Sequence, residues 1–348
     1  MKRLIALIVA LLPFFAAAQE RYVVDCNGGG DFRSVQACFE ALPSKPAAWR
    51  TIEIRPGVYR EKLTLDVYKD KVAIVGTGAR PEDVVLVWND HSGKVVDGYE
   101  MTTYDCWTFS IQANEVFVQN LTVRNDAGRV GQAVALETRG DRIWIDRCRL
   151  EGDQDTFFTK RHFSRQWVTR SYIEGTTDFI FGPSTVVFDH CHIHCKTNSY
   201  ITAASTTERN KFGYVFYRCR VTTAPEVTKM YLGRPWKSTA RTVYAFCELP
   251  ATIRPEGWHN WNDKRREEWS YYGEFRCTGP GADRSRRVAW SHELTAEDWA
   301  QYIPFDEKIF AKKTGSEQFH DEWHPLREPY LLPLLDDCSK YGTEAIED

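Results

Sequence analysis

The sequence predicts an all-β fold, built as a solenoid of parallel strands. Short β-like runs recur about every 25 residues, corresponding positions in these runs are apolar, and segments with helical periodicity are few. The runs begin at Val116, Ile143, Gln166, Val186, Tyr214 and Thr242. A β-sandwich remains an alternative, but it would need tight hairpin turns of the Asn-Gly type, and the segments between the runs carry few of them.

Positions expected to face inward recur in every run, as they should where each coil covers the face of the one before. The third position is large and apolar in each case, and the sixth is a cysteine in four runs, at Cys148, Cys191, Cys219 and Cys247. The chain has ten cysteines, and an even number in an exported protein can also indicate disulfides. We favour a ladder of buried free thiols and keep one or more bridges as the alternative.

The chain begins with a candidate export signal. Lys2 and Arg3 precede the apolar run 4–15, and three alanines end at Ala18, a pattern typical of a cleaved signal peptide over residues 1–18. The apolar run is too short for a membrane span. We therefore expect a periplasmic or secreted protein with no stable membrane insertion.

Residues 19–305 are expected to form one solenoid domain, because no linker or low-complexity stretch interrupts them. Within it, residues 34–42 have helical spacing and could cap the open N-terminal end. Beyond Ile303 the chain turns acidic and aromatic, and we treat residues 306–348 as a C-terminal extension without an assigned role.

The charge balance of the chain and the spacing of its histidines argue against nucleic acid and a metal ion as ligands. With 45 basic and 48 acidic residues, the chain is not expected to bind nucleic acid. His190, His192 and His194 alternate along one run, but no carboxylate stands at a fitting offset for a metal site, so we expect them at a solvent-facing edge. We expect a monomer without metal or cofactor.

Two similar stretches follow successive runs and carry the candidate chemistry. Residues 150–158 and 173–181 both read apolar-Glu-Gly-x-x-Asp-x-apolar-Phe. If the two runs are neighbouring strands of one ladder, Asp155 and Asp178 stack roughly 5 Å apart. Two carboxylates that close cannot both ionise freely, so one should hold a proton near neutral pH while the other stays anionic.

The sequence resembles the pectin methylesterases over about residues 22–302. Five motifs occur in the family's order, namely 57–61 (GVYRE), 132–136 (QAVAL), 152–156 (GDQDT), 178–182 (DFIFG) and 232–236 (LGRPW). The stretches 199–205 and 255–261 look like the bacterial secreted branch. The resemblance implies a right-handed parallel β-helix with long loops forming a cleft, which agrees with the repeat.

The resemblance also implies a role for each candidate catalytic residue. Asp178 would be the nucleophile, and Asp155 the general acid and then the general base. Arg234 would hold Asp178 as the anion, and we expect its guanidinium to lower the pKa of that carboxyl. Gln132 and Gln154 would stabilise the oxyanion. The implied reaction is hydrolysis of the methyl esters of homogalacturonan, the polysaccharide of pectin, to pectate and methanol, with no cofactor.

Substrate contacts are implied mainly for aromatic residues, whose faces suit the C–H faces of sugars. The matching or nearby positions are Thr108, Phe158, Phe181, Trp167 and Trp236. Phe158 stands where the family usually has a tyrosine, and the loop between the two aspartates, which contains Lys160, is longer than in many relatives. Both departures concern the preference of the sugar subsites rather than the reaction.

Other classes of function compete with a pectin esterase. Carboxylates about 5 Å apart also suit a retaining glycoside hydrolase, although such an enzyme has no need of two glutamines and an arginine around an oxyanion. A non-catalytic polysaccharide-binding solenoid should lack at least one catalytic position, and none is missing. A β-helix esterase or thioesterase with another substrate remains open.

Overall fold

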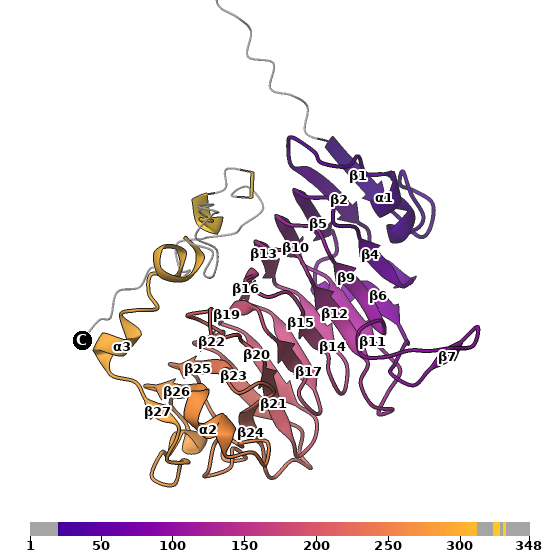
Figure 1. Ribbon diagram of the computed structural model, residues 1–348. Helices are drawn as coiled ribbons and strands as arrows, with labels where there is room; N and C mark the ends of the chain where they lie inside the picture. Colours follow the sequence, from indigo (N-terminus) through magenta and orange to yellow (C-terminus); the bar gives the residue numbers. More distant parts are fainter. Residues whose placement is uncertain (1–19, 312–322, 328–329, 332–348) are drawn as a thin grey trace, which may run out of the picture.

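Successive coils of the chain add strands to three parallel sheets, which form the three faces of a right-handed β-helix (Figure 1). The computed structural model describes residues 20–311, 323–327 and 330–331. The predicted parallel β-helix is thereby confirmed, and the sandwich alternative is wrong. The predicted signal peptide, residues 1–18, lies outside the described residues. In the described ranges, no helix is long and apolar enough to cross a bilayer.

Sheet A has eleven strands and sheets B and C have seven each. Sheet A contains β1 (Glu20–Val24), β2 (Arg50–Ile54), β5 (Val72–Gly76), β10 (Val116–Gln119), β13 (Ile143–Asp146), β16 (Arg165–Thr169), β19 (Thr185–Asp189), β22 (Tyr214–Tyr217), β25 (Arg241–Ala245), β26 (Tyr271–Phe275) and β27 (His292–Glu293). Sheet B contains β3 (Gly57–Arg60), β6 (Val84–Trp88), β11 (Thr122–Asn125), β14 (Arg149–Glu151), β17 (Tyr172–Gly175), β20 (His192–Cys195) and β23 (Arg220–Thr223).

Sheet C carries the residues of most interest for function. It contains β4 (Leu63–Leu65), β9 (Trp107–Ile111), β12 (Val134–Thr138), β15 (Phe157–Thr159), β18 (Ile180–Gly182), β21 (Tyr200–Ala204) and β24 (Tyr231–Pro235). An antiparallel hairpin of β7 (Val95–Val96) and β8 (Tyr99–Glu100) projects from the loop before β9 (Figure 1). The short helices are α1 (Val35–Ala41), η1 (Pro81–Asp83), α2 (Arg265–Trp269), η2 (Pro280–Ala282), α3 (Ala296–Trp299), η3 (Asp306–Phe310) and η4 (Pro325–Arg327).

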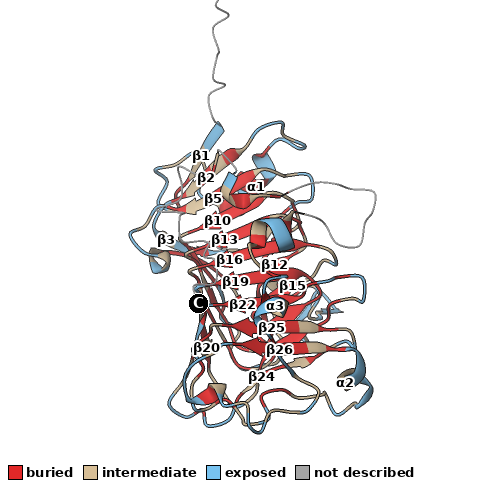
Figure 2. Cartoon of the chain, turned by 90° about the vertical axis from the view of Figure 1, so that its left-hand side faces the viewer, coloured by how far each residue is buried: buried red, intermediate tan, exposed pale blue. Residues whose placement is uncertain are grey.

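The residues at which the runs begin in the sequence are paired with one another in sheet A. Val116 pairs with Ile143, Ile143 with Gln166, and the register continues through Val186 and Tyr214 to Thr242. The third position of each run therefore stacks on its neighbours inside the helix. The rings of Phe188, Phe216 and Tyr244 lie nearly parallel, with centroids 4.4 and 4.3 Å apart. Figure 2 shows the strands buried over most of their length.

The sixth position of the runs forms the expected thiol ladder. Cys148, Cys191, Cys219 and Cys247 are buried and free, and each Sγ donates to a backbone carbonyl of the preceding coil. The nine cysteines in the described residues are all free, which confirms the ladder there. The tenth, Cys338, lies outside the described residues.

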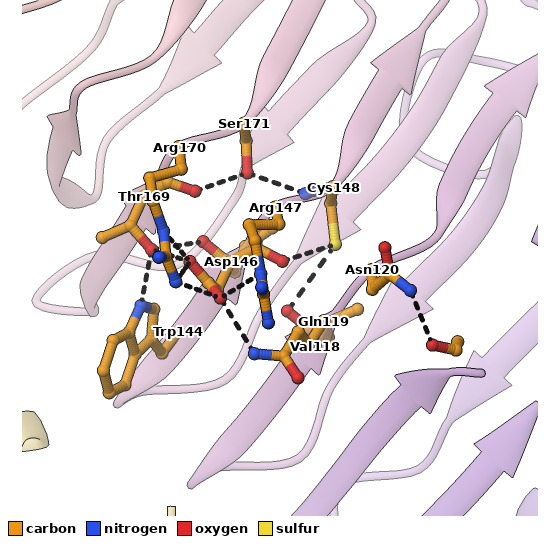
Figure 3. Close-up of polar contacts among 12 residues, drawn as sticks. Val118, Gln119, Asn120, Trp144, Asp146, Arg147, Cys148, Thr169, Arg170 and Ser171 are labelled. Carbon is orange, nitrogen blue, oxygen red and sulfur yellow. Dashed lines mark hydrogen bonds and ion pairs between the residues drawn. The ribbon is translucent and has the colours of Figure 1, made fainter. Parts of the chain in front are cut away.

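A residue with positive φ makes the corner between sheets A and B in successive coils. Asn120, Arg147 and Arg170 have φ of 56°, 49° and 48°, a conformation that costs energy for residues other than glycine. Side-chain hydrogen bonds offset this cost, as Figure 3 shows for the corner region. Asn120 donates to the carbonyl of Gly76, and Arg170 donates to both carboxylate oxygens of Asp146.

The N-terminal end of the solenoid is capped by α1, as the helical spacing predicted. Ser34 accepts a hydrogen bond from the Ala37 backbone N–H, which fixes the first turn. Glu61, the last residue of the GVYRE motif, accepts from the backbone N–H groups of Val35 and Gln36. A carboxylate is well placed there because helix N-termini carry partial positive charge.

The described residues beyond 305 pack on the outer face of sheet A. Phe310 contacts Trp167, with ring centroids 5.8 Å apart, and Trp323 packs against Phe310 at 4.8 Å. Tyr330 stacks on Trp49 at 5.4 Å. This part of the extension therefore covers an aromatic surface of the sheet. The division of the chain at residue 305 remains a prediction.

The stacked interior predicts a large cost for truncating one of its rings. Phe216→Ala should lower the free energy of unfolding by about 3–5 kcal/mol, because Phe216 is fully buried between two parallel rings. The matched control is Val58→Ala, whose side chain is exposed and whose change should stay within about 0.5 kcal/mol. Denaturant titration of both variants measures the difference. Equally small losses of unfolding free energy in both variants would show that the ring stack contributes little to the stability of the core.

Candidate active site

The two repeated motifs place their aspartates at equivalent positions of neighbouring coils. Phe157 pairs with Ile180 in sheet C, so Asp155 and Asp178 each stand two residues before strands that are in register. Both adopt positive φ, 68° and 50°. Their backbone N–H groups bond to the next coil, Asp155 to the Thr177 carbonyl and Asp178 to the Tyr200 carbonyl.

The glycine of the second motif is required by close packing. A Cβ on Gly175 would lie 2.2 Å from the Cβ of Phe179 and 2.6 Å from the Asp153 carbonyl oxygen. Such approaches are not tolerated, so only glycine lets the chain turn here toward Asp178. Gly175 therefore serves the backbone path that leads to Asp178.

A pocket of about 290 Å³ opens beside these aspartates. It is lined by Thr103, Tyr104, Gln132, Gln154, Asp155, Asp178, Phe181, Ala203, Arg234, Trp236 and Trp261. The structure thus brings together all five candidate catalytic residues. Gln132 and Gln154 are bridge partners in neighbouring coils, and each is partly exposed at the pocket.

Arg234 binds Asp178 with two hydrogen bonds. Its Nε donates to Oδ1 at 3.0 Å and its Nη2 to Oδ2 at 2.6 Å, a bidentate pair. Burial raises the pKa of the Asp178 carboxyl, and Arg234 opposes that rise. The net direction differs from the expected lowering, because only 9% of the Asp178 side chain is exposed and desolvation outweighs the guanidinium.

Among the described residues, no such cation is in direct contact with Asp155. Burial, followed by the charge of Asp178, raises its pKa well above the ordinary value, and Arg234 only partly offsets these effects. The proton shared by the two groups therefore resides preferentially on Asp155, and the negative charge on Asp178 beside Arg234. The arrangement provides an anion and a neutral acid side by side.

Aromatic side chains contribute to the pocket lining. Phe181 and Trp236 line the pocket directly, with ring centroids 6.1 Å apart. Phe158 is buried beneath and stacks on Phe181 at 4.2 Å. Phe158 thus supports a pocket ring rather than forming part of the lining.

Besides Phe158, two further predicted substrate contacts do not line the pocket. Trp167 faces the outside of sheet A, where it stacks on Trp144 at 4.7 Å and contacts Phe310. Thr108 is fully buried, and its hydroxyl donates to the carbonyl of Arg124. Both assignments are corrected, because neither side chain can reach a ligand in the pocket.

The pocket is also lined by residues that were not predicted from the sequence as site residues, namely Thr103, Tyr104, Ala203 and Trp261. Trp261 belongs to the stretch 255–261 that contributed to the resemblance, so a signal for it was present. Tyr104 lies in the loop that follows the β7–β8 hairpin, outside the repeat, and no periodicity marks it.

The three alternating histidines lie away from this pocket. His192 and His194 both hydrogen-bond the Thr222 hydroxyl on sheet B, at 2.6 and 2.9 Å, and His190 bonds Asp189. In the described part of the chain, no group of three His, Cys, Asp or Glu side chains could hold a metal ion.

Comparison with known proteins finds similarity to pectinesterases. The pectinesterase family model matches residues 21–313. Pectinesterase 31 of Arabidopsis thaliana is 37% identical over 287 residues, which span 80% of this chain and 89% of that protein. The solved pectin methylesterase from carrot superposes with a TM-score of 0.75 at 30% identity, over 82% of this chain and 92% of its own.

A bacterial structure is also similar. The pectin methylesterase PemA from Erwinia chrysanthemi gives a TM-score of 0.71 at 25% identity, over 83% of this chain and 96% of its own. Three curated relatives, at 37%, 33% and 34% identity, are nevertheless plant enzymes, so the expected placement in the bacterial secreted branch is not supported. The match of the family model across most of the sequence shows that this chain belongs to the pectinesterase family.

Proposed function

We propose that the chain hydrolyses the methyl esters of homogalacturonan and releases methanol. The observation that supports this most is the asymmetric carboxylate pair: Arg234 binds Asp178, while Asp155 is buried and contacts no cation in the part of the chain that the structure describes. Family membership supports the reaction class. One related structure is a pectin methylesterase in complex with a hexasaccharide, at 25% identity and a TM-score of 0.72, over 82% of this chain and 96% of its own.

The first half of the reaction uses Asp178 as the nucleophile. An Asp178 oxygen attacks the ester carbonyl carbon, and the carbonyl electrons move to oxygen to give a tetrahedral oxyanion. The side-chain amides of Gln132 and Gln154, which line the pocket, are available as neutral donors to that oxyanion. Asp155 then gives its proton to the methoxy oxygen as the C–O bond breaks, so that methanol leaves and an acyl-aspartate anhydride remains.

The second half regenerates both aspartates. Asp155, now ionised, takes a proton from a water molecule that attacks the anhydride carbonyl. Collapse of this intermediate releases the galacturonic acid group, which then loses its proton to solvent, and returns Asp178 to its anionic form beside Arg234. Phe181 and Trp236 offer ring faces for the sugar, while Arg234 also faces the pocket that the anionic polymer would enter.

The location of the enzyme follows from the same proposal. Pectin is an extracellular polymer, and residues 1–18 carry the features of an export signal. We propose that the protein is exported after cleavage near Ala18 and acts as a monomer on the polymer. Residues 19–305 would form the catalytic domain and residues 306–348 a C-terminal extension, of which the described residues pack on sheet A.

The reaction predicts a specific loss of methanol release. On highly methylated pectin, Asp178→Asn and Asp155→Asn should abolish it, and Gln132→Ala or Gln154→Ala should lower kcat by about 10²–10³-fold. The control is Asp126→Asn, a carboxylate that pairs with Arg60 away from the pocket and should leave the rate unchanged. An alcohol assay measures methanol, and a reducing-end assay runs in parallel.

Other outcomes would redirect the proposal. Reducing ends in place of methanol would indicate a glycoside hydrolase that uses the same carboxylates. Activity on other esters or thioesters, with none on pectin, would indicate a different substrate. Methanol release unchanged in both aspartate variants would contradict the mechanism.

The raised pKa of Asp155 predicts a pH-dependent effect on stability. As pH rises above about 4, unfolded Asp155 loses its proton while the folded protein retains it, so the wild-type protein loses stability from this group until the folded pKa is passed. Asp155→Asn removes that loss. The melting temperature of the variant minus that of wild type should therefore increase from pH 4 to pH 7.

Asp25→Asn is the control of opposite sign. Hydrogen bonds from the Asn27 backbone, and then from Arg55, lower the pKa of Asp25, so its ionisation stabilises the folded state. That contribution is present above the unfolded pKa and is lost as pH falls through the folded pKa. The melting temperature of Asp25→Asn minus that of wild type should become more negative as pH rises through the acid range. If the melting-temperature difference between Asp155→Asn and wild type did not change between pH 4 and pH 7, Asp155 would be shown to ionise normally.

A further inference from the structure

The guanidinium of Arg234 lies between two aromatic rings. Its Cζ is 3.7 Å from the ring centre of Trp261 and 3.8 Å from that of Tyr200. Beyond Tyr200, the ring of Tyr231 lies 5.2 Å away at an interplanar angle of 9°. Cations stand at both ends, with Arg266 5.3 Å from the Trp261 ring and Arg254 4.8 Å from the Tyr231 ring. We call these six residues the stacked column.

We propose that Tyr200 and Trp261 are positioning residues, which hold the plane of the Arg234 guanidinium so that its two donors meet both oxygens of Asp178. The inference deepens the proposed function, on which it rests, because it concerns how the nucleophile is kept ready. It assigns a role to Tyr200, which is not among the described residues that line the pocket.

The geometry explains why two rings are needed. A bidentate bond requires the guanidinium fork to lie close to the plane of the carboxylate. Two hydrogen bonds fix the direction of the fork but resist tilting of its plane only weakly. Rings on both faces oppose that tilt. Only 18% of the Arg234 side chain is exposed, and the attraction of a cation to a ring face strengthens as water is removed.

The fold holds the column from both sides. Tyr200 and Tyr231 are register partners in β21 and β24, and Arg234 follows Tyr231 in the same strand. On the other side, Arg266 of α2 donates to the backbone carbonyls of Pro235 and Trp236, directly after Arg234. The loop that carries Trp261 is thereby tied to the end of β24.

Other charged and titratable groups near Arg234 and Asp178 bear on any pH profile. Asp155, Arg254, Arg266 and the buried Tyr272 lie around the pair, and His259 contacts Tyr200 and Tyr231 at 5.4 and 5.3 Å. Burial, with Arg234 and Arg254, lowers the pKa of His259. His259 is therefore neutral at neutral pH and adds no repulsion against Arg234.

Tyr200→Leu tests the inference, because it removes one ring without touching the pocket lining. We expect kcat on methylated pectin to fall about tenfold, with KM within about twofold of wild type. The acid limb of the kcat/KM profile should move to higher pH, since a displaced guanidinium no longer favours ionised Asp178. Tyr200→Phe keeps the ring and should restore the wild-type kcat and profile.

The matched control is Tyr231→Leu, which removes the next ring of the same stack but leaves both rings on Arg234. Its kcat should change by less than about twofold. Melting temperatures of all variants are measured together. If Tyr200→Leu fails to fold, Trp261→Leu in the loop on the opposite face serves instead, and its acid limb should shift in the same direction.

The inference would be overturned if folded Tyr200→Leu or Trp261→Leu kept the wild-type kcat and acid limb. It would also be overturned if Tyr231→Leu matched Tyr200→Leu, because the effect would then be one of general packing. A wild-type protein that releases no methanol would instead defeat the proposed function itself. The two failures are therefore distinguishable.

Discussion

In-register pairing of parallel strands is the constraint on which the rest of the structure depends. Each coil hydrogen-bonds to the next with matching positions opposite one another, so a residue type repeated in the sequence becomes a stack in space. Inside the helix this yields rings on rings and thiols on thiols. At the edge of sheet C the same rule sets Asp155 beside Asp178, where two carboxylates would not gather without a scaffold that enforces it.

The chemistry of the site follows from how the surroundings break the symmetry of that pair. Both carboxyl groups are buried, which disfavours their charged forms. Arg234 contacts only one of them, and that contact decides which oxygen atoms carry the charge. The aromatic rings around the guanidinium and Gln132 at the pocket lie on other coils and loops, whereas Gln154 directly precedes Asp155. The site is therefore assembled from parts that are distant in the sequence and are brought together by the coil repeat.

Much of the fold and the centre of the site could be predicted from the sequence, because both follow the repeat. The start of each run, the thiol ladder and the paired aspartates were all visible as periodic positions. Trp167 was misplaced because it is the second residue of its run and so faces outward, beside Trp144 in the coil before. Tyr104 and Trp261 come from loops of irregular length, where periodicity gives no position. The direction of the Asp178 pKa depends on burial, which a motif does not reveal.

The corner between sheets A and B has the same length in the coils that carry the site. The first residues of the paired strands in sheet B stand six positions after the run starts, at 143 to 149, 166 to 172 and 186 to 192. The connection from sheet B to sheet C is also equal in the two aspartate coils, at 149 to 157 and 172 to 180, while the return to sheet A differs, at 157 to 166 and 180 to 186. The coils therefore combine corners of constant length with loops of variable length. Loops can be lengthened or exchanged during divergence within the family without altering the distance between the aspartates, so substrate preference and reaction can evolve separately.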